Sequence, residues 1–266
     1  MRIYHKDIRK GGYGWYRRHF KLNESDRGKH LELQFEGIAT HATIWLNGTV
    51  VHRNWCGYTS SYIDITPLVK YGDQINTIAI RVDAVAQEGW WYEGAGIYRH
   101  TWLVKRSPLH IITDGVYANP VKKTGWQWEI PVEVTLYNSG NEDASIVEVE
   151  VTVYDKNRKL IVQGKTEKGV KVLHQAVAEL KLQVNDPHLW SVDDPYLYTV
   201  EVKVRQNGIQ TDEMKTKCGF RTIRFDKDSG FYLNDEPMKI MGTCNHIDHA
   251  GVGVAVPASI WEFRIR

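Results

Sequence analysis

The feature that most constrains this chain is a two-residue alternation of apolar and polar side chains, repeated along most of its length. Apolar residues occupy every second position in 31–36 and again in 78–83, with mostly polar residues between them. Successive side chains of a β-strand point to opposite faces, so this spacing predicts strands with one buried and one solvated face. Asn47-Gly48 supplies two residues that tolerate a positive φ, which favours a tight type I′ hairpin. We therefore expect an antiparallel β-sandwich over residues 1–106.

The same alternation continues in a second group of segments. Valine or leucine alternates with polar residues in 132–136, 147–153 and 200–204, and the turns between such runs carry asparagine and glycine. Roughly seven short strands suit an immunoglobulin-like β-sandwich. The Cys and Trp signature of antibody domains is absent, so the sequence predicts only this architecture, over residues 107–222.

From residue 223 the pattern changes to strand, polar loop and helix, which are the parts of a βα unit. We expect the strand at 238–241, and Ser259 and Glu262 are placed to form a capping box at the start of the helix. One βα unit cannot bury its own faces. The helix also stops at Arg266 after barely two turns, so we expect the chain to be the front part of a larger protein.

Composition argues against several classes of function. Lys and Arg total 34 against 32 Asp and Glu, and the basic residues are scattered, so no nucleic-acid partner is indicated. No run is long and apolar enough for a membrane span, and residues 1–6 lack the apolar core of a signal peptide, which leaves the localisation open. The 3 cysteines are odd in number and far apart, so no disulfide framework is expected. No glycine-rich phosphate loop is present, and we expect no cofactor.

Five motifs follow one another in a single order: Gly14-Trp15-Tyr16-Arg17-Arg18-His19-Phe20, Ile44-Trp45-Leu46-Asn47-Gly48, Gly94-Ala95-Gly96-Ile97-Tyr98-Arg99, Leu189-Trp190-Ser191 with Asp194-Pro195-Tyr196-Leu197-Tyr198, and Gly219-Phe220-Arg221-Thr222-Ile223. The series resembles glycoside hydrolase family 2, the family of β-galactosidases, β-glucuronidases and β-mannosidases, over essentially the whole chain. The resemblance implies an all-β chain with a jelly-roll, galactose-binding-like sandwich at 1–106 and an immunoglobulin-like sandwich at 107–222. Residues 223–266 would then hold the first βα unit of a truncated TIM barrel.

The chemistry that the resemblance implies is retaining glycoside hydrolysis. One carboxylic acid protonates the leaving oxygen, while a second carboxylate about 5 Å away attacks the anomeric carbon. In the family both are glutamates on later barrel strands, and the acid follows an asparagine. Asn23-Glu24 and Asn141-Glu142 show that dipeptide here, but both are expected in turns of the β domains. We therefore expect both catalytic glutamates to be absent and this chain to be inactive by itself.

The polar loop after the expected barrel strand is the part of the active site that this chain could carry. TIM-barrel sites lie at the C-terminal ends of the strands, where Asn245, His246 and Asp248 would fall. The resemblance implies a substrate-contacting histidine that His246 matches, although Cys244-Asn245 replaces the common Asn-Arg or Asn-Lys. A loop that only satisfies its own backbone is the alternative. Cys244, His246 and His249 fit no standard zinc spacing, so no metal site is predicted.

A second candidate for sugar contact is the aromatic segment that contains Trp90, Trp91 and Glu93. Adjacent aromatic rings suit the C–H faces and hydroxyls of a sugar. The resemblance implies that this loop reaches the barrel site in some members, whereas packing of the first domain against the barrel is the other interpretation. Core or interdomain packing is the expected role of the remaining tryptophans, among them Trp15, Trp45, Trp102 and Trp190.

Two hypotheses about function remain. The first is the N-terminal portion of a retaining glycoside hydrolase, favoured as a β-galactosidase of carbohydrate metabolism, whose partner is a terminal β-linked sugar and whose parent protein is a homo-oligomer. The second is a free-standing carbohydrate-binding or structural β-sandwich module. The half βα unit with His246 favours the first hypothesis, because a module that functions alone has no use for it.

Overall fold

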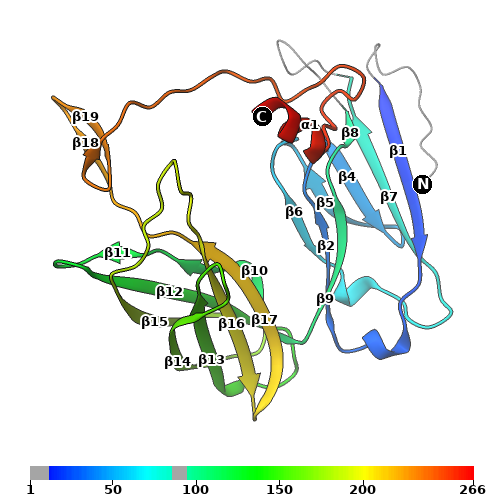
Figure 1. Cartoon of the computed structure of the whole chain (residues 1–266). Coiled ribbons are helices and arrows are strands. Elements are labelled where there is room, and N and C mark those ends of the chain that lie inside the picture. The colour runs from blue at the N-terminus through cyan, green and yellow to red at the C-terminus, as the bar shows by residue number, and fades with distance from the viewer. Residues whose placement is uncertain (1–11, 86–94) are drawn as a thin grey trace. The chain divides into compact units, whose positions relative to one another are not determined.

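The computed structural model describes residues 12–85 and 95–266, and nearly all of its regular structure is β-strand (Figure 1). The chain divides into two compact units. The first unit consists of the chain up to Lys105 together with Thr243–Arg266, and the second consists of Arg106–Gly242. No helix in the described part of the chain has the length and apolar character that a membrane crossing requires.

The first unit contains a four-stranded sheet in the order β1-β7-β4-β5 and a three-stranded sheet in the order β6-β2-β9. The strands of the larger sheet are β1 (Tyr13–Phe20), β7 (Asn76–Asp83), β4 (Ala42–Leu46) and β5 (Thr49–Asn54). Those of the smaller sheet are β6 (Ser61–Asp64), β2 (His30–Phe35) and β9 (Thr101–Arg106). The remaining elements here are β3 (Ile38–Ala39), which pairs with β8 (Gly96–Ile97), and the 3-10 helices η2 (Glu24–Asp26) and η3 (Thr66–Leu68).

Alternation builds this unit as the sequence predicts. Leu31, Leu33 and Phe35 of β2 are buried, and they share one core with buried residues of β4 and β7. The predicted hairpin between β4 and β5 is confirmed, because Asn47 and Gly48 both have positive φ, 52° and 91°. The first unit is therefore an antiparallel sandwich in which each strand of the core contributes every second side chain.

The second unit is a sandwich of two four-stranded sheets around one core. One sheet consists of β10 (Leu109–Ala118), β11 (Val121–Lys122), β12 (Gln127–Asn138) and β15 (Gln175–Asn185). The other follows the order β14 (Leu160–Val170), β13 (Ala144–Tyr154), β16 (Tyr198–Gln206) and β17 (Ile209–Cys218). A small sheet of β18 (Ile223–Asp226), β19 (Gly230–Leu233) and β20 (Glu236–Pro237) follows.

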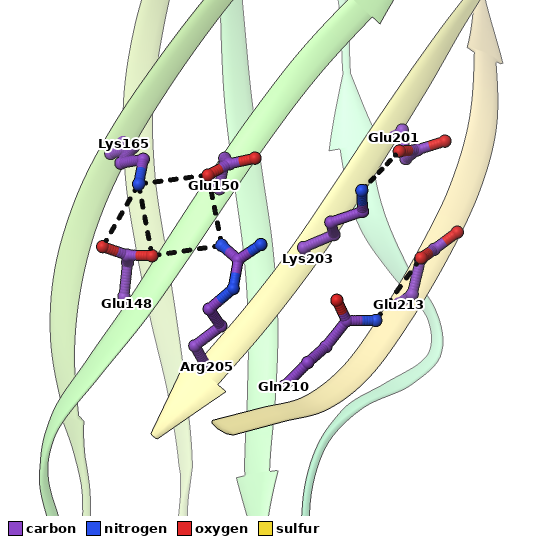
Figure 2. Close-up of polar contacts among 8 residues, drawn as sticks. All are labelled: Glu148, Glu150, Lys165, Glu201, Lys203, Arg205, Gln210 and Glu213. Carbon is purple, nitrogen blue, oxygen red and sulfur yellow. Dashed lines mark hydrogen bonds and ion pairs between the residues drawn. The ribbon is translucent and has the colours of Figure 1, made fainter. Parts of the chain in front are cut away.

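Charged side chains of both signs cover the outer face of the sheet that contains β13 and β16 (Figure 2). We call this set the charge ladder; its members are Glu148, Glu150, Arg158, Lys165, Glu201, Lys203, Arg205, Glu213 and Lys215. Acids stand opposite bases across neighbouring strands, as in the pairs Glu150 with Lys203 and Glu201 with Lys215. Opposite charges in such cross-strand positions stabilise a sheet.

Glu201 is the deepest member of the charge ladder. Its carboxylate lies 3.1 Å from Lys203, 3.2 Å from Lys215 and 3.4 Å from Arg158, and its side chain is buried beneath them. Burial alone would raise the pKa of this carboxyl, but the hydrogen bonds from the three cations outweigh burial and hold the pKa below its ordinary value. Glu201 is therefore ionised in the folded protein at neutral pH.

Three expectations differ from the structure. Residues 238–241 form no strand: the Met238 amide donates to the Phe231 oxygen of β19, but no described strand pairs with residues 239–241, and a strand needs a neighbour along its edge. The helix α1 (Ala258–Ile265) begins after Pro257, which offers no side-chain acceptor, so the capping box of Ser259 and Glu262 is wrong. Of the two roles expected of the other tryptophans, core packing is wrong for Trp15 and Trp102, which are 52% and 49% exposed, whereas Trp45 and Trp190 are half-buried. Interdomain packing of these residues stays a prediction.

Candidate functional site

The polar loop that carries the candidate histidine is fastened to α1 by Arg264. This guanidinium donates to the backbone oxygens of His246, at 3.1 Å, and of Asp248. It also lies 2.8 Å from Nδ1 of His249, and since a guanidinium has no acceptor, that nitrogen must accept. The Arg264 guanidinium also lies over the Trp261 ring, with 4.8 Å between its Cζ atom and the ring centroid, in a cation–π contact. One side chain of the helix thus fixes the path of the loop over four residues.

The three candidate side chains of the loop are accessible. Asn245 and His246 are exposed and Asp248 is half-buried, and the Asn245 amide donates weakly to Thr243 Oγ1 at 3.4 Å. An imidazole, an amide and a carboxylate offer donors and acceptors that suit sugar hydroxyls. The arrangement can bind and orient a polar ligand, but it holds one carboxylate rather than the pair that retaining hydrolysis requires. The candidates Trp90, Trp91 and Glu93 lie outside the described residues.

Seven carboxyl groups elsewhere in the described chain are also unsuited to act as a general acid. Wherever a shift is resolved, the pKa of the carboxyl is lowered; these groups are Asp26, Glu36, Glu129, Glu150, Glu201, Glu213 and Asp226. A carboxylic acid that protonates a leaving group needs the opposite, a raised pKa. These seven groups are therefore held as carboxylates, which bind cations and donors but do not deliver protons.

The two Asn-Glu dipeptides lie outside strands, as the sequence predicts. Asn23 caps η2, and Glu24 pairs with Arg27 at 2.9 Å. Glu142 lies in the turn after β12, where its backbone oxygen accepts from Asn138 Nδ2 at 2.8 Å. Both glutamates therefore belong to segments that connect strands. In the described part of the chain, no three His, Cys, Asp or Glu side chains gather closely enough to hold a metal ion.

Sequence reasoning missed a polar cluster at the end of β2. The carboxylate of Glu36 accepts from Trp102 Nε1 at 2.8 Å and from His100 Nδ1 at 3.0 Å. The indole N–H, followed by the imidazole, holds the pKa of the Glu36 carboxyl below its ordinary value. The three residues meet because β2 and β9 are neighbours in one sheet, and nothing in the sequence announces that pairing.

A cleft in the second unit was also missed. Its volume is about 670 Å³, and its lining includes Lys122, Trp190, Lys217, Arg221 and Thr222. The guanidinium of Arg221 lies over the Trp190 ring, 4.7 Å from the centroid. The Thr222 hydroxyl is buried and has no hydrogen-bond partner among the described residues. The motif 219–223 was the signal in the sequence, but the cleft forms only when the segments around Trp190 and β11 come together.

Arg264→Ala tests whether the helix fixes the loop. The amides of His249, Val252 and Gly253 donate within the loop, and we expect their exchange with deuterium to become at least about tenfold faster when the clamp is lost. Hydrogen exchange followed by mass spectrometry measures this rate. Arg266→Ala is the matched control, because only the backbone of that residue is bonded to the helix, and equal rates in the two variants would contradict the clamp.

Comparison with known proteins places these units among carbohydrate-active enzymes. A family model described as glycosyl hydrolases family 2 matches residues 110–221, and one described as a glycosyl hydrolase 2 galactose-binding domain-like module matches residues 7–140. The β-galactosidase BoGH2A of Bacteroides ovatus is 33% identical and covers 92% of this chain and 29% of that protein. A β-galactosidase of Thermoanaerobacter pseudethanolicus is also 33% identical, with 91% of this chain and 33% of that protein covered.

Other relatives carry a different activity in their names. A putative β-glucuronidase of Formosa agariphila is 30% identical and covers 92% of this chain and 23% of that protein. Among solved structures, a family 2 glycosyl hydrolase from Bacteroides cellulosilyticus superposes with a TM-score of 0.88 at 34% identity, over 96% of this chain and 35% of that one. The Bacteroides uniformis β-glucuronidase superposes with a TM-score of 0.88 at 29% identity, over 96% of this chain and 32% of that one. The chain spans about a third or less of the curated relatives described here.

Proposed function

The chain belongs to family 2 of the glycosyl hydrolases, and on that premise we propose that it forms the N-terminal β domains of a retaining β-galactosidase. The observation that carries the proposal is the pair of family models, which together match residues 7–221. Substrate choice rests on the relatives: the two at 33% identity are β-galactosidases, and the β-glucuronidases stand at 30% or below. β-Glucuronidase is the alternative activity.

In this proposal, residues 1–106 are the jelly-roll domain, 107–222 the immunoglobulin-like domain, and 223–266 the beginning of a TIM-barrel domain. The barrel supplies both catalytic glutamates, which the resemblance to family 2 assigns to later barrel strands. The parent enzyme assembles as a homo-oligomer.

The loop residues then bind sugar rather than break its bond. In this proposal the side chains of His246 and Asn245 donate to hydroxyls of the terminal sugar; their exposure, and the fixing of their loop by Arg264, support it. Asp248 accepts from a hydroxyl in the same way. Trp90 and Trp91 offer their ring faces to the C–H face of the sugar, with Glu93 as a further acceptor.

The isolated chain of 266 residues is expected to hydrolyse neither p-nitrophenyl β-galactoside nor p-nitrophenyl β-glucuronide, because the proposal assigns both catalytic glutamates to the barrel domain. Release of p-nitrophenol measures turnover, and the full-length protein under the same conditions is the positive control. Its preference between the two substrates decides the activity. Turnover by the isolated chain that survives repurification and disappears in His246→Ala would overturn the assignment of inactivity.

A further inference from the structure

A pair of tryptophans, of which Trp15 is exposed and Trp45 half-buried, lies on the outer face of the sheet β1-β7-β4-β5. The rings of Trp15 on β1 and Trp45 on β4 stack with centroids 5.6 Å apart and planes inclined by 26°. The two strands are not neighbours, since β7 runs between them. Ala79 of β7 is the register partner of Trp45. Because its side chain is small, the two indole rings can contact each other above β7. We call this pair, with Tyr13 and Val50, the aromatic platform.

The sheet register places all of the platform on one face. Trp15 pairs with Arg81, and Trp45 pairs with Ala79, two residues along the same strand. The intervening residue Ile80 points into the core. Tyr13, Trp15 and Val50 are each about half exposed, so the platform crosses the whole sheet as a continuous apolar strip in contact with solvent. Exposed apolar patches bordered by polar residues mark binding surfaces in many proteins.

Guanidinium groups flank the platform. Arg81 is engaged, since it lies over the Tyr13 ring at 4.3 Å and pairs with Asp83 at 3.2 Å. Arg17 and Arg53 lie on the same face by register, and neither makes an ion pair with any residue that the structure describes. Beside its flat aromatic rings, the face therefore presents two cations that pair with no acid in the described part of the chain.

We propose that this face is a second carbohydrate site, separate from the loop of His246, which binds a glycan chain bearing carboxylate or sulfate groups. The indoles would stack on the C–H faces of successive sugars, and Arg17 and Arg53 would hold the acidic groups by charge-assisted hydrogen bonds. Binding here goes beyond the proposed hydrolase activity and needs no catalytic residue. The chain can therefore fail one test and pass the other.

Affinity electrophoresis of the 266-residue chain through polygalacturonate, dextran sulfate and neutral galactan tests the proposal. We expect retardation by one or both of the acidic polymers and a much smaller effect of galactan, with retardation falling as salt is added. Trp15→Ala and Trp45→Ala should weaken binding by at least about tenfold, and Arg17→Gln by several-fold. The two acidic polymers distinguish carboxylate from sulfate recognition.

Trp126→Ala is the matched control, because Trp126 is 75% exposed in the second unit, and this variant should bind as the original chain does. Circular dichroism of each variant shows that loss of binding is not loss of folding. Equal retardation by galactan, no retardation by any polymer, or full binding by Trp15→Ala would overturn the proposal. A concentration-dependent dimer in sedimentation that Trp15→Ala abolishes would instead assign the face to a second copy of the chain.

Discussion

Phe220→Ala is expected to destabilise the second unit by about 3–5 kcal/mol, the usual range for truncating a fully buried phenylalanine. Phe220 is completely buried, and two aromatic rings meet it edge to face: Trp128 at 5.4 Å and Tyr198 at 4.9 Å between centroids. Alanine would remove both contacts and leave a cavity that rigid neighbouring strands cannot collapse to fill. Urea unfolding of the whole chain, followed by tryptophan fluorescence, measures the change.

Phe225→Ala makes the same substitution at a residue that is 73% exposed, and it should change the free energy of unfolding by less than about 0.5 kcal/mol. Because both variants replace phenylalanine with alanine, the difference between their free energies of unfolding measures the effect of burial alone. If Phe220→Ala and Phe225→Ala unfold at the same urea concentration, the aromatic core described here is wrong.

Glu201→Gln is expected to lower the free energy of unfolding at neutral pH by about 1–3 kcal/mol, because three cations lose their shared carboxylate. The pH dependence gives the sharper test. The folded pKa of Glu201 lies below the ordinary value of 4.5, so its contribution is complete above pH 4.5 and is lost as the pH falls through the folded pKa. The two proteins should therefore differ most at pH 7 and converge in acid.

The control for this prediction is Glu167→Gln on β14 of the same sheet. Glu167 is exposed, makes no ion pair with the described residues and stands opposite Glu148, so the same isosteric change removes no attraction and should leave stability unchanged or slightly raised at neutral pH. Urea midpoints at pH 7, 5 and 3 give both comparisons. A difference between Glu201→Gln and the original chain that stays constant from pH 7 to 3 would contradict the role given to ionised Glu201.

The strands could be predicted because alternation is a local property. Val147 to Val153 and Val200 to Val204 show it without interruption, and in each run every second residue is a buried valine. The hairpin at Asn47-Gly48 was equally local, since two adjacent residues set its backbone. Residues 238–241 show the limit of this reasoning: they are apolar enough for a strand, but a strand exists only with a partner, which local sequence does not contain.

The position of Trp15 shows a second limit of sequence-based prediction, which concerns the face of a strand that points to the core. Trp15 alternates with Tyr16, so an apolar residue faces each side of β1, and the sequence does not say which side is the core. The register of β1 with β7 settles which side faces the core, because Tyr16 pairs with the buried Ile80 and therefore shares its face. The same holds for the candidate loop, whose histidine was visible in the sequence while its fastening by Arg264 depends on which face of α1 turns toward it.

The charge ladder also determines which alignment of the strands can form. The core face of β13 and β16 is almost uniformly valine, so sliding one strand past the other by two residues would bury the same side chains and leave the core unchanged. On the outer face the slide is not neutral: moving β16 in one direction sets Glu201 between Glu150 of β13 and Glu213 of β17, and moving it in the other direction sets Lys203 against Lys215. The core thus makes the sandwich stable without choosing among its alignments, and the solvent-facing charges make that choice.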